Sequence, residues 1–278
     1  MHESCRAAAD REPCPESAPL CGESSVGVAL VGPRSLAQLI GFEVAETALF
    51  DHACFATRQV HEGQVLTYAG DACRALYIVR SGLFKSCMLD SSGCVQGLGF
   101  PMAGDMIGVD GLASGEYGSD ATALESSEVV MIPVDHMMQL SRDDSSVATL
   151  FYRLIGREIV RDQSILFLLG SLSAEARVAT FLLDLSDRHV TQGHARSSLP
   201  LPMTRRDIAD YLGLKIETVS RTLSALARNG ILRVYKRQVD LLDVRRLREI
   251  ASGSSEATRG RPIPRLQGAA VHEYALAA

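Results

Sequence analysis

Apolar and polar residues alternate in short runs through much of the first half of the chain. The runs include QVLTYAGD (64–71), ALYIVRSGLFKSCMLDSSG (75–93), CVQGLGFPMAGDMIG (94–108) and DATALESSEVVMIP (120–133), with turn-forming residues between them. Short strands at this spacing predict a compact antiparallel barrel or jelly roll. A short helical region is expected ahead of them, near Leu36 to Ala56.

The pattern changes to a helical period at about Val134 and keeps it to Leu169, and Gly170 is expected to break the helix. Its apolar stripe is wider than packing on one domain requires, so we predict a dimer interface along it. The residues assigned to this interface are Leu150, Leu154, Ile155, Glu158, Ile159, Asp162, Ile165, Leu166 and Leu169. The alternative is that this helix packs only on the barrel of its own chain. A further helix is expected over 173–189.

The stretch MTRRDIADYLGLKIETVSRTLSALARNG (203–230) predicts two helices joined by a tight turn. Thr204 can cap the first helix, with Asp207 in capping-box position. Gly213 stands where the chain must turn. The second helix should run from about Ile216 to Asn229, with Gly230 as its C-terminal cap. Its buried face would hold Ile216, Val219, Leu223 and Leu226.

The other face of this second helix carries Glu217, Ser220, Arg221 and Ser224. Arginine can donate two hydrogen bonds to guanine, and glutamate can accept one from cytosine N4. The arrangement is that of a helix-turn-helix recognition helix in a major groove. The alternative is a solvated face on a purely structural helix.

The residues after Gly230, ILRVYKRQVDLLD, alternate around a polar tip and predict a two-stranded hairpin, the wing of a winged helix. Between Met203 and Glu249 the chain has 11 Lys and Arg against 6 Asp and Glu, although its overall net charge is −5. A basic module on an acidic chain predicts a polyanionic partner for that module.

Composition bears on the number of domains, on membrane contact, on disulfides and on enzymatic activity. The 278 residues suffice for two modest domains. No apolar run approaches the roughly 20 residues that span a bilayer, and no signal-peptide core follows Met1, so we expect a cytoplasmic protein without membrane contact. The seven cysteines are expected to be free thiols. The scattered histidines offer no metal-ligand spacing and no catalytic constellation, so we expect no enzyme.

The order of barrel, long helix and winged helix-turn-helix resembles the CRP/FNR superfamily of bacterial transcription regulators, and its FNR branch in particular. The stretches LYIVRSGLFKS, AGDMIGVDGLASG, ALESSEVVMIP and MTRRDIADYLGLKIETVSR carry the resemblance. It implies an α+β chain with a cyclic-nucleotide-binding-like β-roll sensor domain (36–140), a dimerisation helix (141–170) and a winged helix-turn-helix (171–250). Disordered or flexible tails are expected at 1–35 and 251–278.

The family's recognition motif, E-x-x-S-R, is present as Glu217, Ser220 and Arg221. The resemblance implies a homodimer on double-stranded DNA, regulating transcription with RNA polymerase from the inverted repeat TTGAT-N4-ATCAA. Glu217 and Arg221 would share the G·C pair, and Ser220 would contact a neighbouring thymine. Phosphate contacts, which position the protein rather than specify the sequence, are expected from Thr204, Arg205, Arg206, Lys215, Lys236 and Arg237.

The cyclic-nucleotide branch of the family holds the ribose with a Glu and the phosphate with an Arg-Ser pair. Here Val109 stands at the position of the Glu, and Tyr117 and Gly118 stand at those of the pair. A buried phosphate requires a positive partner, so we expect no cyclic AMP binding and no other cofactor.

Oxygen-sensing members of the family hold an iron–sulfur cluster on four cysteine thiolates. Cys5, Cys14 and Cys21 are spaced more widely than that motif, and Val130 stands at the fourth ligand position. No metal site is therefore expected. An oxygen or redox sensor with a non-standard cluster on these cysteines, a haem, or a thiol switch at Cys73 or Cys94 remains the alternative.

Asp162 lies in the stripe of the long helix and would sit near its own copy in a two-fold dimer. Like charges at an interface disfavour association, and the matching Asp of FNR proteins is tied to a monomer–dimer switch. We therefore predict a marginal, tunable dimer, with a solvated Asp at the edge of the interface as the alternative.

Overall fold

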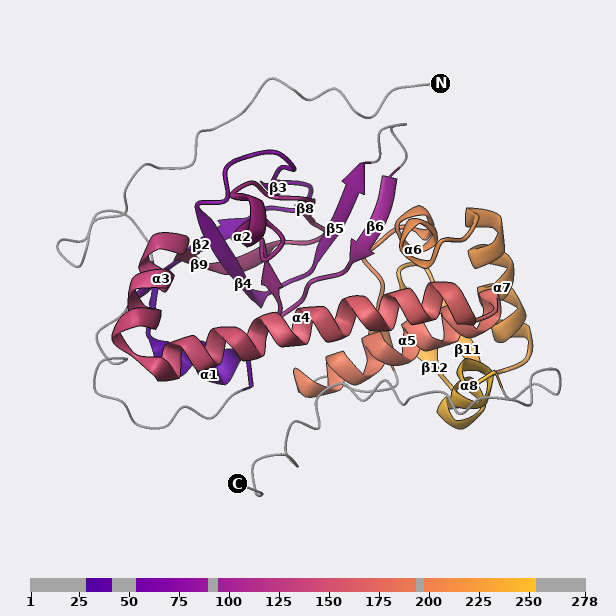
Figure 1. Cartoon of the computed structure of the whole chain (residues 1–278). Coiled ribbons are helices and arrows are strands. Elements are labelled where there is room, and N and C mark those ends of the chain that lie inside the picture. The colour runs from indigo at the N-terminus through magenta and orange to yellow at the C-terminus, as the bar shows by residue number, and fades with distance from the viewer. Residues whose placement is uncertain (1–28, 42–53, 90–94, 194–197, 254–278) are drawn as a thin grey trace.

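The computed structural model describes residues 29–41, 54–89, 95–193 and 198–253. Two antiparallel sheets with the strand orders β1-β2-β9-β4-β7 and β3-β8-β5-β6 pack against each other, which confirms the predicted β-roll (Figure 1). Their strands are β1 (Leu30–Val31), β2 (Phe55–Val60), β3 (Val65–Thr67), β4 (Ala75–Ser81), β5 (Phe84–Leu89), β6 (Val95–Gly99), β7 (Met106–Ile107), β8 (Asp120–Ala123) and β9 (Ser127–Pro133).

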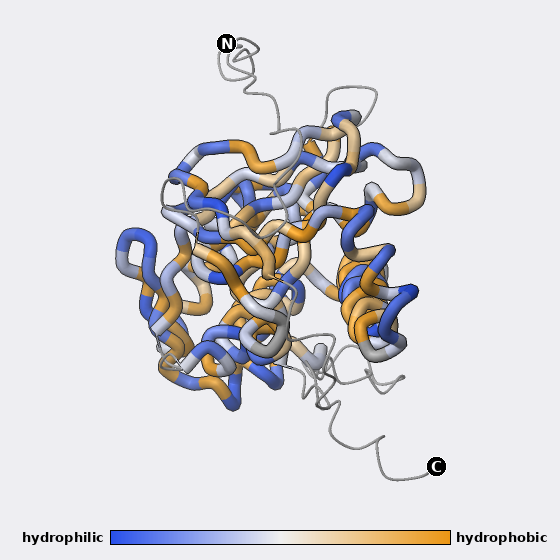
Figure 2. The backbone as a smooth tube through the Cα atoms, turned by 90° about the vertical axis from the view of Figure 1, so that its left-hand side faces the viewer, coloured by the Kyte–Doolittle hydropathy of each residue, from blue (hydrophilic) through white to orange (hydrophobic). Residues whose placement is uncertain are grey.

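The alternation within β4 explains how the β-roll is covered. Tyr77 and Val79 pack with residues of the opposite sheet, whereas Leu76 and Ile78 pack against helices on the outer side. The first five residues of the strand, 75–79, are all apolar because both faces of this stretch are buried, whereas Arg80 and Ser81 at its end are exposed. Figure 2 shows the hydropathy of the described residues along the backbone, with apolar positions gathered inside and polar ones in the surface turns.

The helix expected near Leu36 to Ala56 is shorter and starts earlier. Helix α1 spans Pro33–Leu39 and has its proline in the first turn, where a missing N–H costs nothing. Phe55 and Ala56 already belong to β2. β1 and the start of α1 also fold residues that were expected in the N-terminal tail. Residues 42–53, and the tails before 29 and after 253, lie outside the described residues.

Three helices follow in the first domain and its connection: α2 (Gly111–Ser114), α3 (Val134–Asp143) and α4 (Ser145–Ser171). The continuous helix predicted from Val134 is therefore two helices. Asp144 adopts an extended conformation (φ −140°, ψ 115°) and separates them, because aspartate favours helix ends over helix interiors. The long helix starts at Ser145 rather than 141, and Gly170 lies inside it instead of ending it.

The C-terminal domain begins with α5 (Ala174–Thr191), which Ser173 caps by accepting a hydrogen bond from the Ala176 N–H. The predicted two-helix motif and the hairpin are present as α6 (Arg205–Leu212), α7 (Ile216–Arg228), β11 (Leu232–Tyr235) and β12 (Gln238–Leu241). Two further elements were not predicted: β10 (Ser198–Pro200), which pairs with β12, and α8 (Val244–Ala251).

The two domains share one hydrophobic core. Leu83, Phe100 and Met102 of the first domain are buried among the apolar side chains of the helices α5 to α8. The Phe100 ring lies 5.8 Å from that of Phe181 and 5.3 Å from that of Tyr211, centroid to centroid. In Figure 1, α6 accordingly lies directly beside β6. The sheet that contains β6, with the order β3-β8-β5-β6, therefore sets where the two-helix motif lies; we call it the sensor sheet.

Candidate nucleic-acid interface

The first helix of the motif, α6, is fixed at both ends. The Thr204 hydroxyl accepts a hydrogen bond from the Asp207 N–H (3.1 Å), and the Asp207 carboxylate accepts one from the Thr204 N–H (2.8 Å). This is the predicted capping box. At the other end Gly213 adopts a left-handed conformation (φ 60°, ψ 40°), which glycine reaches without steric cost. The chain therefore turns sharply into α7.

The second helix, α7, has two chemically distinct faces. Val219, Leu223 and Leu226 are buried in the core, and Ile216 is half-buried. The opposite face carries the exposed side chains Glu217, Ser220, Arg221 and Ser224. A guanidinium and a carboxylate one helical turn apart can donate to guanine and accept from cytosine. This face, the candidate reading face, therefore has the chemistry needed to contact base edges in a major groove.

The turn between β11 and β12 is an exposed cationic tip. Lys236 has a φ of +50°, which is uncommon for a residue with a side chain, and its ammonium lies 5.6 Å from the centroid of the exposed Tyr235 ring. Arg237 lies 3.8 Å from the Glu62 carboxylate, with both side chains about two-thirds exposed. Such an exposed ion pair contributes little to stability, so Arg237 can exchange it for another anion.

The residues predicted to contact phosphates border two pockets. The first turn of α6 and the wing turn enclose a pocket of about 160 Å³, lined by Leu201, Met203, Thr204, Arg205, Lys236 and Arg237. Arg206 and Lys215 line a second pocket of about 220 Å³, together with Glu217 of the reading face. Burial lowers the pKa of the half-buried Arg205 guanidinium from its ordinary value, yet an arginine remains charged. The first pocket therefore presents positive charge to an anion. In the second, the cations Arg206 and Lys215 are joined by two carboxylates, those of Asp210 and Glu217.

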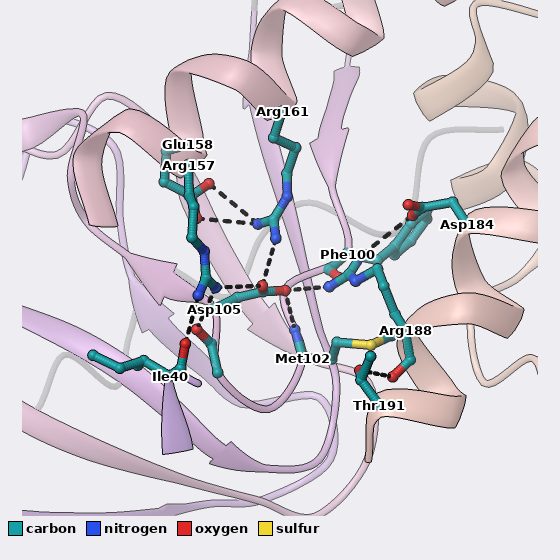
Figure 3. A network of polar contacts seen from close by, with 11 residues as sticks. Ile40, Phe100, Met102, Asp105, Arg157, Glu158, Arg161, Asp184, Arg188 and Thr191 are labelled. Carbon is teal, nitrogen blue, oxygen red and sulfur yellow. Dashed lines mark hydrogen bonds and ion pairs between the residues drawn. The ribbon is translucent and has the colours of Figure 1, made fainter. Parts of the chain in front are cut away.

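A buried carboxylate joins the sensor domain to the helices on either side of the domain connection (Figure 3). Arg161 of α4 and Arg188 of α5 donate to the carboxylate of Asp105, whose side chain is 5% exposed. The Met102 N–H donates a further hydrogen bond at 2.9 Å. Burial alone would raise the pKa of Asp105, but the guanidinium groups of Arg188 and Arg161 lower it below its ordinary value. The carboxylate therefore stays ionised and fixes both helices.

Arg157, one turn before Arg161, extends this network by donating to the carbonyls of Ile40 (2.7 Å) and Gly104 (3.0 Å). The sequence did not predict this network around Asp105. The four-residue spacing of Arg157 and Arg161 was a local signal for a shared helix face, but Asp105 and Arg188 are 83 positions apart along the chain.

Arg177 joins the end of α4 to the turn of the two-helix motif. Its guanidinium donates to the carbonyls of Leu169 (2.7 Å) and Leu172 (3.0 Å), and to that of Leu212 (3.0 Å) at the end of α6. Carbonyls at helix C-termini lack partners within the helix and carry negative partial charge. A single cation therefore holds the ends of α4 and α6 together.

The segment of the sensor domain that would receive a nucleotide phosphate is occupied by the chain itself. The Asp110 carboxylate accepts hydrogen bonds from the Gly111 and Gly118 N–H groups (both 3.1 Å) and from the Ser119 hydroxyl (2.8 Å). Tyr117 is buried, and its hydroxyl donates to the Ala75 carbonyl at 2.6 Å. An anionic phosphate would meet a carboxylate here instead of a cation. These residues do not fit a cyclic nucleotide.

The described cysteines are Cys54, which is exposed, and Cys73 and Cys87, which are half-buried. A thiol switch at Cys73 would require a reactive, accessible thiol. Burial, and secondarily the nearby Asp110 carboxylate, raises the pKa of its thiol, which lowers its reactivity. Cys5, Cys14, Cys21 and Cys94 lie outside the described residues. Within the part of the chain that the structure describes, no three His, Cys, Asp or Glu residues gather as a metal site requires.

The long helix α4 is only partly covered by its own chain. Leu150 and Leu154, assigned to the dimer interface from sequence, are buried in the protomer's own core, because this end of α4 packs on the β-roll. Ile155, Glu158, Ile165 and Leu169 are half-buried. The exposed stripe consists of Tyr152, which was not predicted, and of Ile159, Asp162 and Leu166. None of the described helices is both long and apolar enough to cross a membrane.

Comparison with known families gives two matches. Residues 57–144 match the profile described as cyclic nucleotide-binding domain, and residues 176–250 match that described as Crp-like helix-turn-helix domain. The first match fits the β-roll, although the phosphate-binding residues differ. The second spans α5 to α8 and therefore includes the exposed reading face.

Full-length relatives show similarity across both domains. The chain is 36% identical over 216 residues to the transcriptional regulatory protein btr of Bordetella pertussis, covering 78% of this chain and 89% of the relative. It is 37% identical over 210 residues to the fumarate and nitrate reduction regulatory protein of Escherichia coli, covering 74% and 84%. Among solved structures, FixK2 from Bradyrhizobium japonicum has a TM-score of 0.65 at 30% identity, covering 70% of this chain and 96% of that chain.

Proposed function

Since the chain belongs to the CRP/FNR family of transcription regulators, we propose that it binds the inverted repeat TTGAT-N4-ATCAA as a homodimer in the cytoplasm. The observation that carries this proposal is the exposed face of α7, on which Glu217, Ser220 and Arg221 lie within two helical turns. Glu217 and Arg221 read the G·C pair of each half-site, and Ser220 contacts the neighbouring thymine. The cations along the two pockets hold the flanking phosphates.

The proposed homodimer forms along α4. Tyr152, Ile159 and Leu166 are 74%, 51% and 70% exposed and recur at heptad-like spacing on one stripe of this helix. An exposed apolar stripe of this kind is suited to pack against its own copy in a two-fold pair. The pair would place two α7 helices on successive turns of the major groove, as an inverted repeat requires.

We further propose that DNA binding requires no cyclic nucleotide. The Asp110 carboxylate takes the hydrogen bonds that a phosphate would need, and Tyr117 fills the adjacent space. Addition of cyclic AMP should therefore leave the dissociation constant for the inverted repeat unchanged. A tightening of the complex at micromolar cyclic AMP would contradict this part of the proposal.

The decisive experiment is fluorescence anisotropy of protein purified in air, on the TTGAT-N4-ATCAA duplex and on a scrambled duplex of equal length. Salt must be fixed near physiological strength, because phosphate contacts make both affinities salt-dependent. We expect specific binding to be at least about a thousandfold tighter than binding to the scrambled duplex. Equal, weak binding to both would contradict the proposal for protein without a cluster; the measurement would then be repeated without air after reconstitution with iron and sulfide.

Regulation with RNA polymerase is the final part of the proposal, and it rests on the family of regulators to which the chain belongs. Run-off transcription from a promoter that contains the inverted repeat tests it. The transcript yield should change when the wild-type protein is added and remain constant with Arg221→Ala. A yield that does not respond to the wild-type protein would contradict this part.

A further inference from the structure

Strand β6 of the sensor domain lies unusually close to α6. A Cβ atom built on Gly97 would lie 2.8 Å from the Tyr211 backbone nitrogen and 2.9 Å from its Cα atom. Distances this short exclude any side chain at position 97 unless α6 moves. Glycine inside a strand commonly marks such a close approach of another backbone. Next to it, the Gln96 side-chain amide donates to the Asp210 carbonyl at 2.8 Å.

Strand β5 contacts the same face of α6 through an ion pair. The Lys85 ammonium lies 3.0 Å from one carboxylate oxygen of Asp207, and the two side chains are 35% and 13% exposed. The other oxygen of Asp207 accepts the Thr204 N–H in the capping box. One carboxylate therefore links a sensor strand to the first turn of α6, where Thr204 and Arg205 line a candidate phosphate pocket.

Aromatic packing holds this same face of α6. Tyr211 contacts Phe100 of the sensor domain and Phe181 of α5, at centroid separations of 5.3 and 5.7 Å. One short helix is thus held by four kinds of contact: steric fit, an amide–carbonyl hydrogen bond, an ion pair and aromatic packing. The sensor sheet therefore fixes both the position and the rotation of α6, and α7 follows because Gly213 joins the two helices tightly.

We propose that β5 and β6 form a docking surface that sets the orientation of the recognition helix, with Gly97 and Lys85 as positioning residues for DNA binding. The inference rests on the proposed function, since it concerns how a dimer chooses its half-site spacing. In a docked dimer the two α7 helices have a fixed separation, and only one spacer length matches it. If the contact between the sensor sheet and α6 is loosened, the separation of the two α7 helices is no longer fixed. The DNA-binding domain must then be ordered when it binds DNA, and the entropy lost in ordering it weakens binding.

Gly97→Ala tests the proposal, and Gly99→Ala is its matched control. Both glycines lie in β6, neither has a positive φ, and a Cβ at position 99 would meet nothing within 4 Å. Dissociation constants are measured on inverted repeats with spacers of three, four, five and six bases. We expect Gly97→Ala to reduce the discrimination between the best and the other spacers about fivefold to tenfold, and Gly99→Ala to match the wild type.

Lys85 provides a second, independent test. Lys85→Gln should reduce the spacer discrimination in the same direction, and Lys85→Arg should restore it, because an arginine can still pair with Asp207. A merely destabilised protein would instead lose affinity for all spacers equally. Equal losses on every spacer, or identical behaviour of Gly97→Ala and Gly99→Ala, would overturn the inference.

Hydrogen exchange separates failure of this inference from failure of the proposed function. Wild-type protein without preference for any inverted repeat would contradict the proposed function. The docking is then judged by amide exchange in α6, which should be faster in Gly97→Ala than in Gly99→Ala. Equal exchange in the two variants would overturn the inference whatever the DNA results.

Discussion

At the scale of single residues, aspartates join parts of the chain that are distant in sequence. Asp105 binds Arg161 and Arg188, and Asp207 pairs with Lys85. Asp110 accepts hydrogen bonds from the N–H groups of Gly111 and Gly118. Asp105 is buried, Asp207 is half-buried and Asp110 is exposed, and each carboxylate is satisfied by cations, N–H groups or a hydroxyl. Removing one partner of such a group leaves another group buried without compensation, so substitutions at these positions should have large effects.

Asp105→Asn should destabilise the protein, and the loss should depend on pH. Because the folded-state pKa of Asp105 is lowered, the carboxylate contributes stability above its unfolded pKa and loses it as pH falls through the folded pKa. At pH 7 we expect a cost on the order of 3 kcal/mol. The difference from wild type should shrink as pH falls below 3.8. Urea unfolding across this pH range measures it, with the exposed Asp71→Asn as control; a pH-independent difference would contradict the prediction.

Arg221→Ala and Arg206→Ala should affect DNA binding in different ways. Loss of Arg221, which we propose reads a base, should remove about 1–3 kcal/mol of discrimination at one base pair. Loss of Arg206, an exposed cation beside the second pocket, should weaken binding to all sequences alike and reduce the salt slope by about one unit. Anisotropy titrations on matched and single-mismatch duplexes at several salt concentrations separate the two; equal losses on specific and random DNA for Arg221→Ala would refute its role.

At the scale of secondary-structure elements, α4 is divided into a stretch that packs on its own domain and a stretch that is exposed. Its first turns bury Leu150 and Leu154 against the β-roll, and its middle exposes Ile159, Asp162 and Leu166. The sequence predicted the length and apolar stripe of this helix, because both follow from a local period. It could not assign the stripe between the protomer's own core and the exposed face, since that division depends on where the β-roll lies.

Asp162→Ala should tighten the proposed dimer. Two copies of this exposed carboxylate would lie near each other along paired α4 helices, and their repulsion disfavours association. We expect the dimer dissociation constant to fall about 1.5-fold to fivefold, the range of a single exposed charge interaction. Sedimentation equilibrium measures this constant, and Asp71→Ala, on the turn before β4, removes an exposed carboxylate from the sensor domain as control. An unchanged monomer–dimer equilibrium would refute the prediction.

The other elements show which features local sequence patterns can predict and which they cannot. The turn and faces of α6 and α7 were predicted because capping, glycine placement and helical period all lie within about thirty residues. Strand β10 was missed because its three residues pair only with β12, about forty positions later. The interruption at Asp144 has no glycine or proline to mark it. The Asp105 network was missed for the same reason of distance along the chain.

At the scale of the whole molecule, the β-roll and the DNA-binding domain contribute to one shared hydrophobic core. Phe100 is 6% exposed and packs with Phe181 and Tyr211 from the other domain. The sequence predicted two domains and their order but not this shared core, because residues from 83 to 247 contribute to it. A signal that moved the β-roll would therefore reach α6 directly as well as through α4.

Phe100→Ala should lower the stability of both domains together. Truncating a buried aromatic side chain costs about 3–5 kcal/mol, and here the loss falls on a core that both domains share. Calorimetry should show a single transition at a lower temperature, with equal calorimetric and van 't Hoff enthalpies. Met88→Ala, at a side chain that is 44% exposed, should leave the transition unchanged. Separate transitions for the two domains would show that they unfold independently.

The shared core also limits how this chain can be divided. A fragment that began at α5 would lack Phe100 and Met102 and would present Phe181 and Tyr211 to water as one contiguous aromatic patch. Patches of this kind promote aggregation. We therefore expect the DNA-binding domain not to remain soluble as an isolated fragment. The same requirement applies to a chimera in which the sensor domain is replaced by that of a relative. The new sensor domain would need a glycine at the position of Gly97 and an aromatic residue at that of Phe100.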